Sequence, residues 1–108
     1  MKTNKALSAL GMAMRAGKLA TGDEIVLKAI RAGKAKLVIV ANDASDNTKK
    51  KFRDKCGSYQ VSLLEAYDRE SLGRAIGKAE RVVIAVTDVQ FAKLIAGHIG
   101  QNMEVDLT

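Results

Sequence analysis

Hydrophobic residues recur with helical spacing in five stretches of the chain and form apolar runs between them. The runs Leu37–Ala41 and Val82–Val86 contain no polar alternation, which is typical of strands that are covered on both faces. Shorter strands are predicted at Lys18–Thr21 and Gln60–Glu65. The predicted helices run from Lys2 to Gly17, from Thr21 to Gly33, from Ser45 to Cys56, from Asp68 to Gly77 and from Thr87 to Gly100.

The second helix carries the clearest boundary signals. Thr21 and Glu24 stand in the spacing of a capping box, so the Thr21 hydroxyl is expected to accept from a backbone N–H of the first turn. Gly33 suits the position just after a helix end. The predicted inward stripe consists of Ile25, Val26, Ala29 and Ile30. The backbone N–H groups of Gly22 and Asp23 would then form a potential anion site at the helix start.

The other helices have boundary signals of the same kind. Asp43 and Ser45 are the candidate caps of the third helix, which Gly57 is expected to end. Asp68 is the expected cap of the fourth helix. Thr87 and Gln90 form a second capping box before the last helix.

Helices and strands therefore alternate in the order α-β-α-β-α-β-α-β-α. This order predicts an α/β protein, a three-layer α/β/α sandwich with a central sheet of about four strands. A length of 108 residues is that of one domain, spanning residues 1–108. Right-handed crossovers place Gly22 and the loop at 78–81 at ends of the sheet, but the pattern leaves open whether they share one end.

Charge is distributed unevenly over a chain whose net charge is +6. Residues 1–55 hold thirteen Lys or Arg against five Asp or Glu, whereas residues 56–108 hold five against seven. A basic half on a small domain favours a polyanionic partner, nucleic acid first. A solvated basic surface that serves only solubility is the alternative, and it is the preferred interpretation for the lysine run at 49–51.

The motifs of several functional classes are missing from the sequence. No metal-ligand spacing, phosphate-binding loop or nucleophile elbow occurs, so neither a cofactor nor a metal is expected and the chain is predicted not to be an enzyme. Cys56 is interpreted as a small buried hydrophobe. A single cysteine excludes an internal disulfide, and no long apolar span is present. These features predict a soluble cytoplasmic protein without a membrane partner.

Three motifs in this order resemble those of a known family. They are LATGDEIVLKAIRAGKAKLVIVANDAS at 19–45, LGRAIG at 72–77 and the apolar strand Val82–Val86. Together they resemble the kink-turn RNA-binding ribosomal proteins of the L7Ae and L30e type, and most closely their small bacterial YlxQ-like members. The likeness runs from the first helix to the last. It implies the same sandwich and a monomeric RNA-binding protein of the translation apparatus, with the ribosome as a further expected partner.

Members of that family grip RNA with two elements. One is the start of the second helix, typically G-x-N-E-x-x-K or G-x-K-Q-x-x-K, which lies against sheared G·A pairs beside a sharp bend. The other is the loop after the LG-x-A-x-G helix, which packs on flipped-out nucleotides. Carried over by position, the implied RNA-binding residues are Gly22, Asp23, Glu24, Ile25 and Lys28, then Lys78, Ala79, Glu80, Arg81 and Val82, with Asp43, Ala44 and Ser45 lining the same surface.

Two positions depart from the family pattern. Glu24 stands where the family has Asn or Lys, and Ile25 stands where it has Glu or Gln. Isoleucine cannot hydrogen-bond a guanine edge, although the YlxQ-like members share this acidic pair followed by an aliphatic residue. The alternative function is therefore a protein-interaction or regulatory module on the same fold with weakened RNA specificity, which the Asp23–Glu24 pair favours. A nucleotide-binding enzyme would need a phosphate loop that the sequence lacks.

Overall fold

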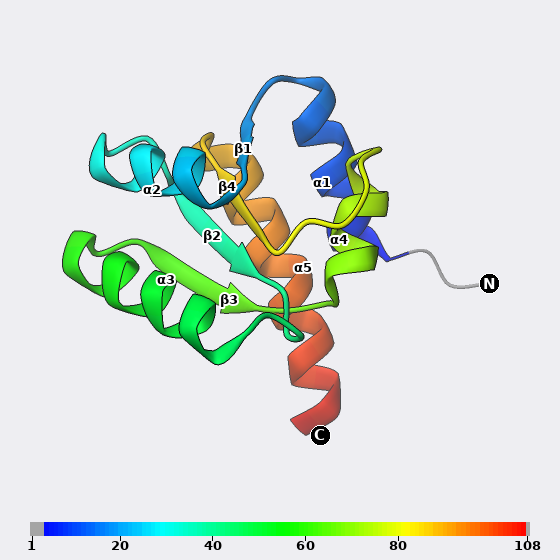
Figure 1. Cartoon of the computed structure of the whole chain (residues 1–108). Helices are drawn as coiled ribbons and strands as arrows, with labels where there is room; N and C mark the ends of the chain where they lie inside the picture. Colours follow the sequence, from blue (N-terminus) through cyan, green and yellow to red (C-terminus); the bar gives the residue numbers. More distant parts are fainter. Residues whose placement is uncertain (1–3, 108) are drawn as a thin grey trace.

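The computed structural model describes the backbone of residues 4–107 and the side chains of residues 4–100. Helices and strands alternate along the whole chain (Figure 1). In chain order they are α1 (Lys5–Arg15), β1 (Leu19–Thr21), α2 (Asp23–Arg31), β2 (Leu37–Val40), α3 (Asp46–Tyr59), β3 (Ser62–Glu65), α4 (Arg69–Ala75), β4 (Val83–Val86) and α5 (Val89–Leu107). The predicted alternation and the predicted number of strands are confirmed.

The four strands form one mixed sheet in the order β1-β4-β2-β3. β4 pairs antiparallel with both β1 and β2, and β2 pairs parallel with β3. β1, β2 and β3 therefore run in one direction and β4 runs in the opposite direction. This arrangement places the ends of three strands and the beginning of β4 on the same side of the sheet.

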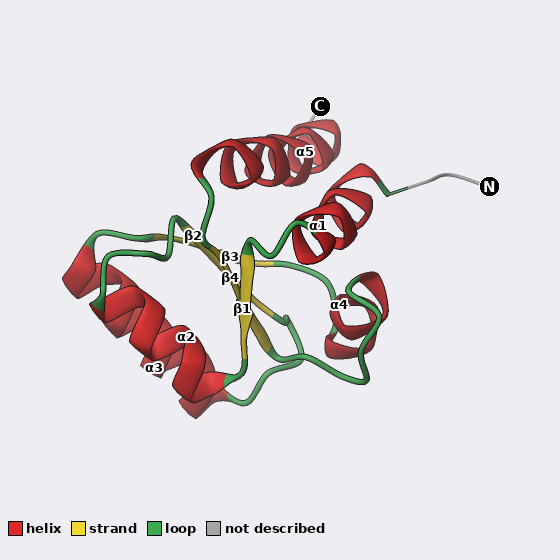
Figure 2. Ribbon diagram, turned by 90° about the horizontal axis from the view of Figure 1, so that it is seen from above, coloured by secondary structure: helices red, strands yellow, loops and turns green. Residues whose placement is uncertain are grey.

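The sheet is the middle layer of a three-layer α/β/α sandwich, as predicted. Figure 2 shows α2 and α3 on one face, and α1, α4 and α5 on the other. The central strands β2 and β4 are buried along their whole length because successive side chains point into opposite layers. Leu37 and Ile39 pack towards α1, α4 and α5, whereas Val38 and Val40 pack towards α2 and α3.

Both predicted capping boxes are wrong, for the same physical reason. Thr21 is the last residue of β1 and pairs with Ile84, so α2 begins one residue later with Gly22 as its N-cap. Likewise the Thr87 N–H donates to the Lys18 carbonyl at 2.9 Å, which extends the sheet. The first turn of α5 is instead capped by Asp88, whose carboxylate accepts from the Phe91 N–H at 2.9 Å. In each case sheet pairing engages the threonine and displaces the helix start.

The caps that do not compete with the sheet are confirmed. Ser45 accepts from the Thr48 N–H at 3.1 Å and caps α3. Asp68 accepts from the Ser71 N–H at 2.7 Å and caps α4.

Several predicted helix details differ from the structure. α1 begins at Lys5 after its cap Asn4, whereas the predicted start at Lys2 lies outside the described residues, and α5 continues past Gly100 to Leu107.

α3 continues past Gly57 to Tyr59 and ends at Gln60, which takes the left-handed conformation with φ 58°. Ile25 does not belong to the buried stripe of α2, because its side chain is 58% exposed. Leu27 is buried in its place.

None of the helices within residues 4–107 is both long and apolar enough to cross a membrane.

Candidate nucleic-acid interface

Strand pairing gathers the three segments singled out in the sequence at one end of the sheet. Thr21, at the end of β1, pairs with Ile84 near the beginning of β4. Val40, at the end of β2, pairs with Val83 at the beginning of β4. The segment that follows β1 (22–28), the segment that follows β2 (43–45) and the loop that precedes β4 (78–82) therefore lie side by side. These three segments are called the strand-end surface below.

The turn into α2 depends on a glycine. Gly22 has φ 95° and ψ 148°, a conformation that side-chain-bearing residues rarely adopt, and no atom outside the local chain lies near the position of a Cβ. Its carbonyl accepts from the Val26 N–H at 2.9 Å and starts the helix. Because Gly22 has no side chain to cap the helix, the backbone N–H groups of the first turn face the surface without a side-chain cap.

The acidic pair at the start of α2 is partly neutralised by α3. Lys51 Nζ lies 2.9 Å from Asp23 Oδ2 in a half-exposed ion pair. Glu24, Ile25 and Lys28 project to solvent on the same helix. The surface around Gly22 therefore combines a compensated carboxylate, an exposed carboxylate, an apolar side chain and a lysine.

The loop at 78–82 lies directly on α4. Gly73 is buried in α4, and a Cβ at this position would lie 1.6 Å from the Ala79 carbonyl oxygen. The Lys78 N–H donates to the Gly73 carbonyl at 2.9 Å. Gly73, the first glycine of the LGRAIG segment, is therefore required, because the loop backbone occupies the place that a side chain would take.

Two further backbone hydrogen bonds hold the same loop to neighbouring elements. The Arg81 N–H donates to the Arg69 carbonyl at 3.0 Å, and the Ala41 N–H donates to the Val82 carbonyl at 2.8 Å. Lys78, Ala79 and Glu80 are exposed, whereas Arg81 and Val82 are partly buried. The loop is thus a fixed part of the surface.

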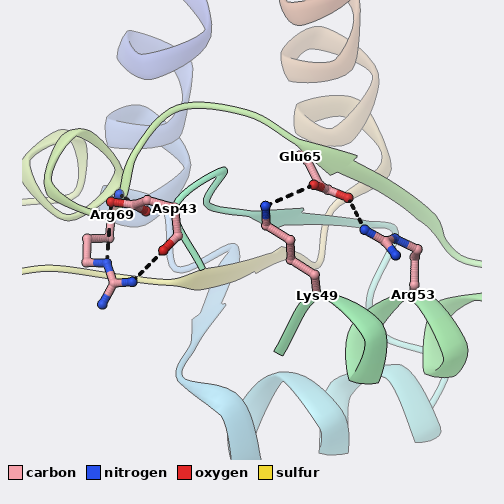
Figure 3. Close-up of polar contacts among 5 residues, drawn as sticks. All are labelled: Asp43, Lys49, Arg53, Glu65 and Arg69. Carbon is pink, nitrogen blue, oxygen red and sulfur yellow. Dashed lines mark hydrogen bonds and ion pairs between the residues drawn. The ribbon is translucent and has the colours of Figure 1, made fainter. Parts of the chain in front are cut away.

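The segment at 43–45 supports the surface more than it contributes free side chains. Asp43 Oδ1 accepts from the Arg69 N–H at 3.0 Å, and Arg69 Nη2 donates back to the Asp43 carbonyl at 2.6 Å (Figure 3). Ala44 is buried and Ser45 caps α3. Asp43 and Arg69 therefore join the end of β2 to the beginning of α4.

A second ion-pair group lies beside this segment. Glu65, at the end of β3, contacts Arg53 at 2.9 Å and Lys49 at 3.7 Å, both from α3 (Figure 3). The hydrogen bond from Arg53, followed by the charges of Arg53 and Lys49, lowers the pKa of the Glu65 carboxyl group. Among the residues with described side chains, no group of three His, Cys, Asp or Glu could hold a metal ion.

Sequence reasoning missed the contributions of Lys51 and Arg69. Lys51 belongs to the run at 49–51, which was interpreted as a solvated face, and only the packing of α3 beside α2 brings it to Asp23. Arg69 has no sequence signal beyond its place after the cap Asp68. Both contacts join residues that lie more than twenty positions apart, so no local pattern could reveal them.

Comparison with known proteins finds relatives about half identical to this chain. RNA-binding protein YlxQ from Bacillus subtilis (strain 168) is 52% identical over 88 residues, covering 81% of this chain and 88% of that protein. Its namesake from Enterococcus faecium is 49% identical over 89 residues, covering 82% and 85%. A protein of unknown function from Bacillus halodurans C has a TM-score of 0.89 at 51% identity, covering 91% of this chain and 99% of its own.

A more distant structure shares the fold alone. The Giardia lamblia 15.5kD RNA binding protein has a TM-score of 0.75 at 23% identity, covering 90% of this chain and 83% of its own. At the level of the family, the profile of the Ribosomal protein L7Ae/L30e/S12e/Gadd45 family matches residues 4–96, which include every segment of the strand-end surface. The chain belongs to the Ribosomal protein L7Ae/L30e/S12e/Gadd45 family.

Proposed function

We propose that this protein is a non-enzymatic RNA-binding protein of the translation apparatus that recognises structured, kink-turn-like RNA through the strand-end surface. The observation that carries the proposal is the sheet register, which brings residues 22–28, 43–45 and 78–82 to one end of the sheet. Two relatives about half identical to this chain are named RNA-binding proteins, which supports RNA as the ligand. As part of the same proposal, the protein acts as a cytoplasmic monomer.

The start of α2 is suited to contact with an RNA backbone. Gly22 allows a phosphate to approach the N–H groups of the first helical turn, where the helix dipole favours negative charge. Lys28, one turn after Glu24, is exposed and can donate to a phosphate or to a guanine edge. The ion pair with Lys51 reduces the repulsion that Asp23 would exert on a nearby phosphate.

Ile25 supplies an apolar contact instead of a hydrogen bond. Its exposed side chain can pack against an unstacked base, which is how proteins commonly recognise irregular RNA. A glutamine or glutamate at this position, as in the wider family, would add hydrogen bonds to a base edge. The proposal therefore predicts binding to the bent RNA shape with weaker base discrimination.

The loop at 78–82 offers a rigid second contact. Its backbone bonds to α4 and to the end of β2 leave little conformational freedom to lose when RNA binds. Lys78 is exposed. Arg81 is partly buried as a residue, and its guanidinium Nη1 makes an exposed hydrogen bond to the Glu80 carbonyl at 2.8 Å. Such a guanidinium can bond a phosphate or stack on a flipped-out base.

The test is a titration of the protein with a labelled kink-turn RNA and with a plain duplex of equal length, each at two salt concentrations. A preference for the kink-turn that persists at the higher salt concentration is the expected result, because shape and base contacts are less sensitive to salt than phosphate contacts. Equal binding to both RNAs that disappears with added salt would refute kink-turn recognition.

Substitution of Lys28 tests the surface directly. Lys28→Ala should weaken kink-turn binding by about 1–3 kcal/mol if the lysine reads a base edge, and by less if it contacts only phosphate. Lys50→Ala is the matched control, because Lys50 is an exposed lysine of α3 paired with Asp54 and lies outside the strand-end surface. Equal affinities of both variants and the unchanged protein would remove Lys28 from the site.

One observation favours a second function, a protein-interaction or regulatory module on the same fold. An exposed isoleucine beside Asp23 and Glu24 would also suit a protein partner. Ile25→Gln separates the two functions. Under the RNA proposal this variant binds the kink-turn at least as tightly as the unchanged protein. If the surface instead docks a protein, the variant and the unchanged protein should both bind RNA weakly and without specificity.

A further inference from the structure

A second basic surface lies at the end of the sheet opposite to the strand-end surface. The sequence Arg-Ala-Gly-Lys occurs twice, at 15–18 and at 31–34, each time between a helix and a strand. In both copies the arginine is the last residue of the helix, and the glycine has nearly the same φ, 71° for Gly17 and 73° for Gly33. The chain therefore builds the same turn twice.

The two turns also share one hydrogen-bond pattern. The N–H of each lysine reaches back to a carbonyl five residues earlier, from Lys18 to Ala13 at 2.9 Å and from Lys34 to Ala29 at 2.9 Å. This bond closes a Schellman motif, which ends a helix and directs the chain outward. Both turns therefore have the same hydrogen-bonded backbone geometry.

The end of β4 brings the two turns together. The Lys18 carbonyl accepts from the Thr87 N–H at 2.9 Å, and the Lys36 N–H donates to the Val86 carbonyl at 2.8 Å. Lys18 and Lys36 therefore flank β4 on its two sides. Their backbones lie about 10 Å apart, because adjacent strands are spaced by about 4.8 Å. In Figure 1 both turns lie in the upper part of the view, where β1 and β2 begin and β4 ends.

The surface is positively charged and largely uncompensated. Its cations are all exposed, and within residues 4–100 none of them forms an ion pair: Arg15, Lys18, Arg31, Lys34 and Lys36. These five residues are called the turn surface. The carboxylate of Asp88 follows β4 at this end and is engaged as the cap of α5.

Helix stability accounts for only part of this charge. An arginine in the last turn of a helix stabilises the negative end of the helix dipole, which explains Arg15 and Arg31. Lys18, Lys34 and Lys36 follow the helix ends, and Lys36 Nζ makes only a surface hydrogen bond to the Gly33 carbonyl at 3.0 Å. Among the residues with described side chains, these three lysines form no ion pair, so their charge is available to a ligand.

We propose that the turn surface binds the sugar-phosphate backbone of a second, double-stranded RNA segment, so that the protein holds two RNA segments at opposite ends of its sheet. Tyr59, 47% exposed, ends α3 on the same side, shortly before Ser62 pairs with Leu37, and its hydroxyl can donate to a phosphate oxygen of the duplex. The inference rests on the proposed function in taking RNA as the ligand and in counting the strand-end surface as the other RNA site.

The test uses the triple variant Lys18→Gln, Lys34→Gln and Lys36→Gln. Its matched control, Lys5→Gln, Lys50→Gln and Arg74→Gln, removes the same charge from exposed residues outside both surfaces. A labelled plain RNA duplex is titrated with each protein over a series of salt concentrations, with and without one equivalent of unlabelled kink-turn RNA. An excess is avoided because the duplex stems of the kink-turn RNA would then occupy the turn surface as well. Thermal melting checks that both variants fold.

In the unchanged protein the duplex should bind even when one equivalent of kink-turn RNA is present, forming a complex with both RNAs. In the turn-surface variant the slope of log affinity against log salt should fall by about 2–3, because each lost phosphate contact removes about 0.7–0.9 from it. The control should keep the slope of the unchanged protein. Kink-turn preference should survive in the turn-surface variant and decline in Lys28→Ala.

Several outcomes would overturn the inference. Equal losses in the two triple variants would show that net charge alone sets duplex affinity. Competition by poly-glutamate as effective as that by RNA would mean a surface for any polyanion, including acidic proteins. Displacement of the duplex by kink-turn RNA would mean a single shared site. A missing kink-turn preference, with duplex binding still dependent on the turn surface, would refute the proposed function and leave this inference standing.

Discussion

Gly73→Ala is the sharpest test of how the loop at 78–82 is held. The added Cβ would lie 1.6 Å from the Ala79 oxygen, 2.5 Å from the Ala79 carbonyl carbon and 3.0 Å from Glu80 Cα. All three are backbone atoms, so no side-chain rotation relieves the contact. The Ala79 carbonyl would have to retreat by about 2 Å to reach the 3.4 Å of ordinary van der Waals contact.

The expected loss of stability follows from the contacts that this retreat disturbs. The loop is held by the Lys78 and Arg81 N–H groups and by the Val82 carbonyl, and each such bond contributes about 0.5–1.5 kcal/mol net. Overpacking adds about 1–3 kcal/mol, and the better helix propensity of alanine returns about 1 kcal/mol. We expect a net loss of about 2–6 kcal/mol, equivalent to a fall in Tm of roughly 10 °C or more for a domain of this size.

The assay is thermal and urea unfolding followed by circular dichroism, with Gly57→Ala as the matched control. Gly57 also lies inside a helix, but nothing stands within 4 Å of a Cβ built there. This variant should gain about 0.5–1 kcal/mol. A Gly73→Ala protein that unfolds at or above the midpoint of the unchanged protein, as Gly57→Ala should, would refute the close approach of the loop to α4.

Two further predictions concern ionisable groups. Arg53 and Lys49 lower the pKa of Glu65 in the folded state. The ionised Glu65 carboxylate therefore stabilises the fold above the unfolded-state pKa of about 4.3, and this stabilisation is lost as the pH falls through the lower pKa of the folded state. Glu65→Gln should therefore be slightly less stable than the unchanged protein at pH 7 and equal to it in strong acid, and a stability difference that does not change with pH would contradict this reasoning. Burial raises the pKa of the Cys56 thiol to about 11, so a thiol reagent at pH 8 should modify the folded protein far more slowly than the urea-unfolded protein, and equal rates would show that Cys56 is accessible.

The candidate site could be predicted only in part from the sequence. The resemblance singled out 22–28, 43–45 and 78–82, but the helical and strand pattern could not say whether they meet. Their meeting depends on β4 pairing between β1 and β2, because that pairing aligns Thr21 and Val40 with the beginning of β4. The compensation of Asp23 by Lys51 and the anchoring of Asp43 by Arg69 depend on the same long-range packing.

The sequence by itself determined the elements and the layered architecture, because hydrophobic periodicity is a local property that backbone geometry converts into helices and strands. It also determined the caps at Ser45 and Asp68, whose partners lie three residues away. Tertiary structure alone decided the strand order and the true starts of α2 and α5. Strand pairing holds Thr21 in β1 and Thr87 at the end of β4, so each helix is capped one residue later, at Gly22 and at Asp88. Strand pairing joins residues distant along the chain, and for that reason only the folded protein shows which segments share a surface.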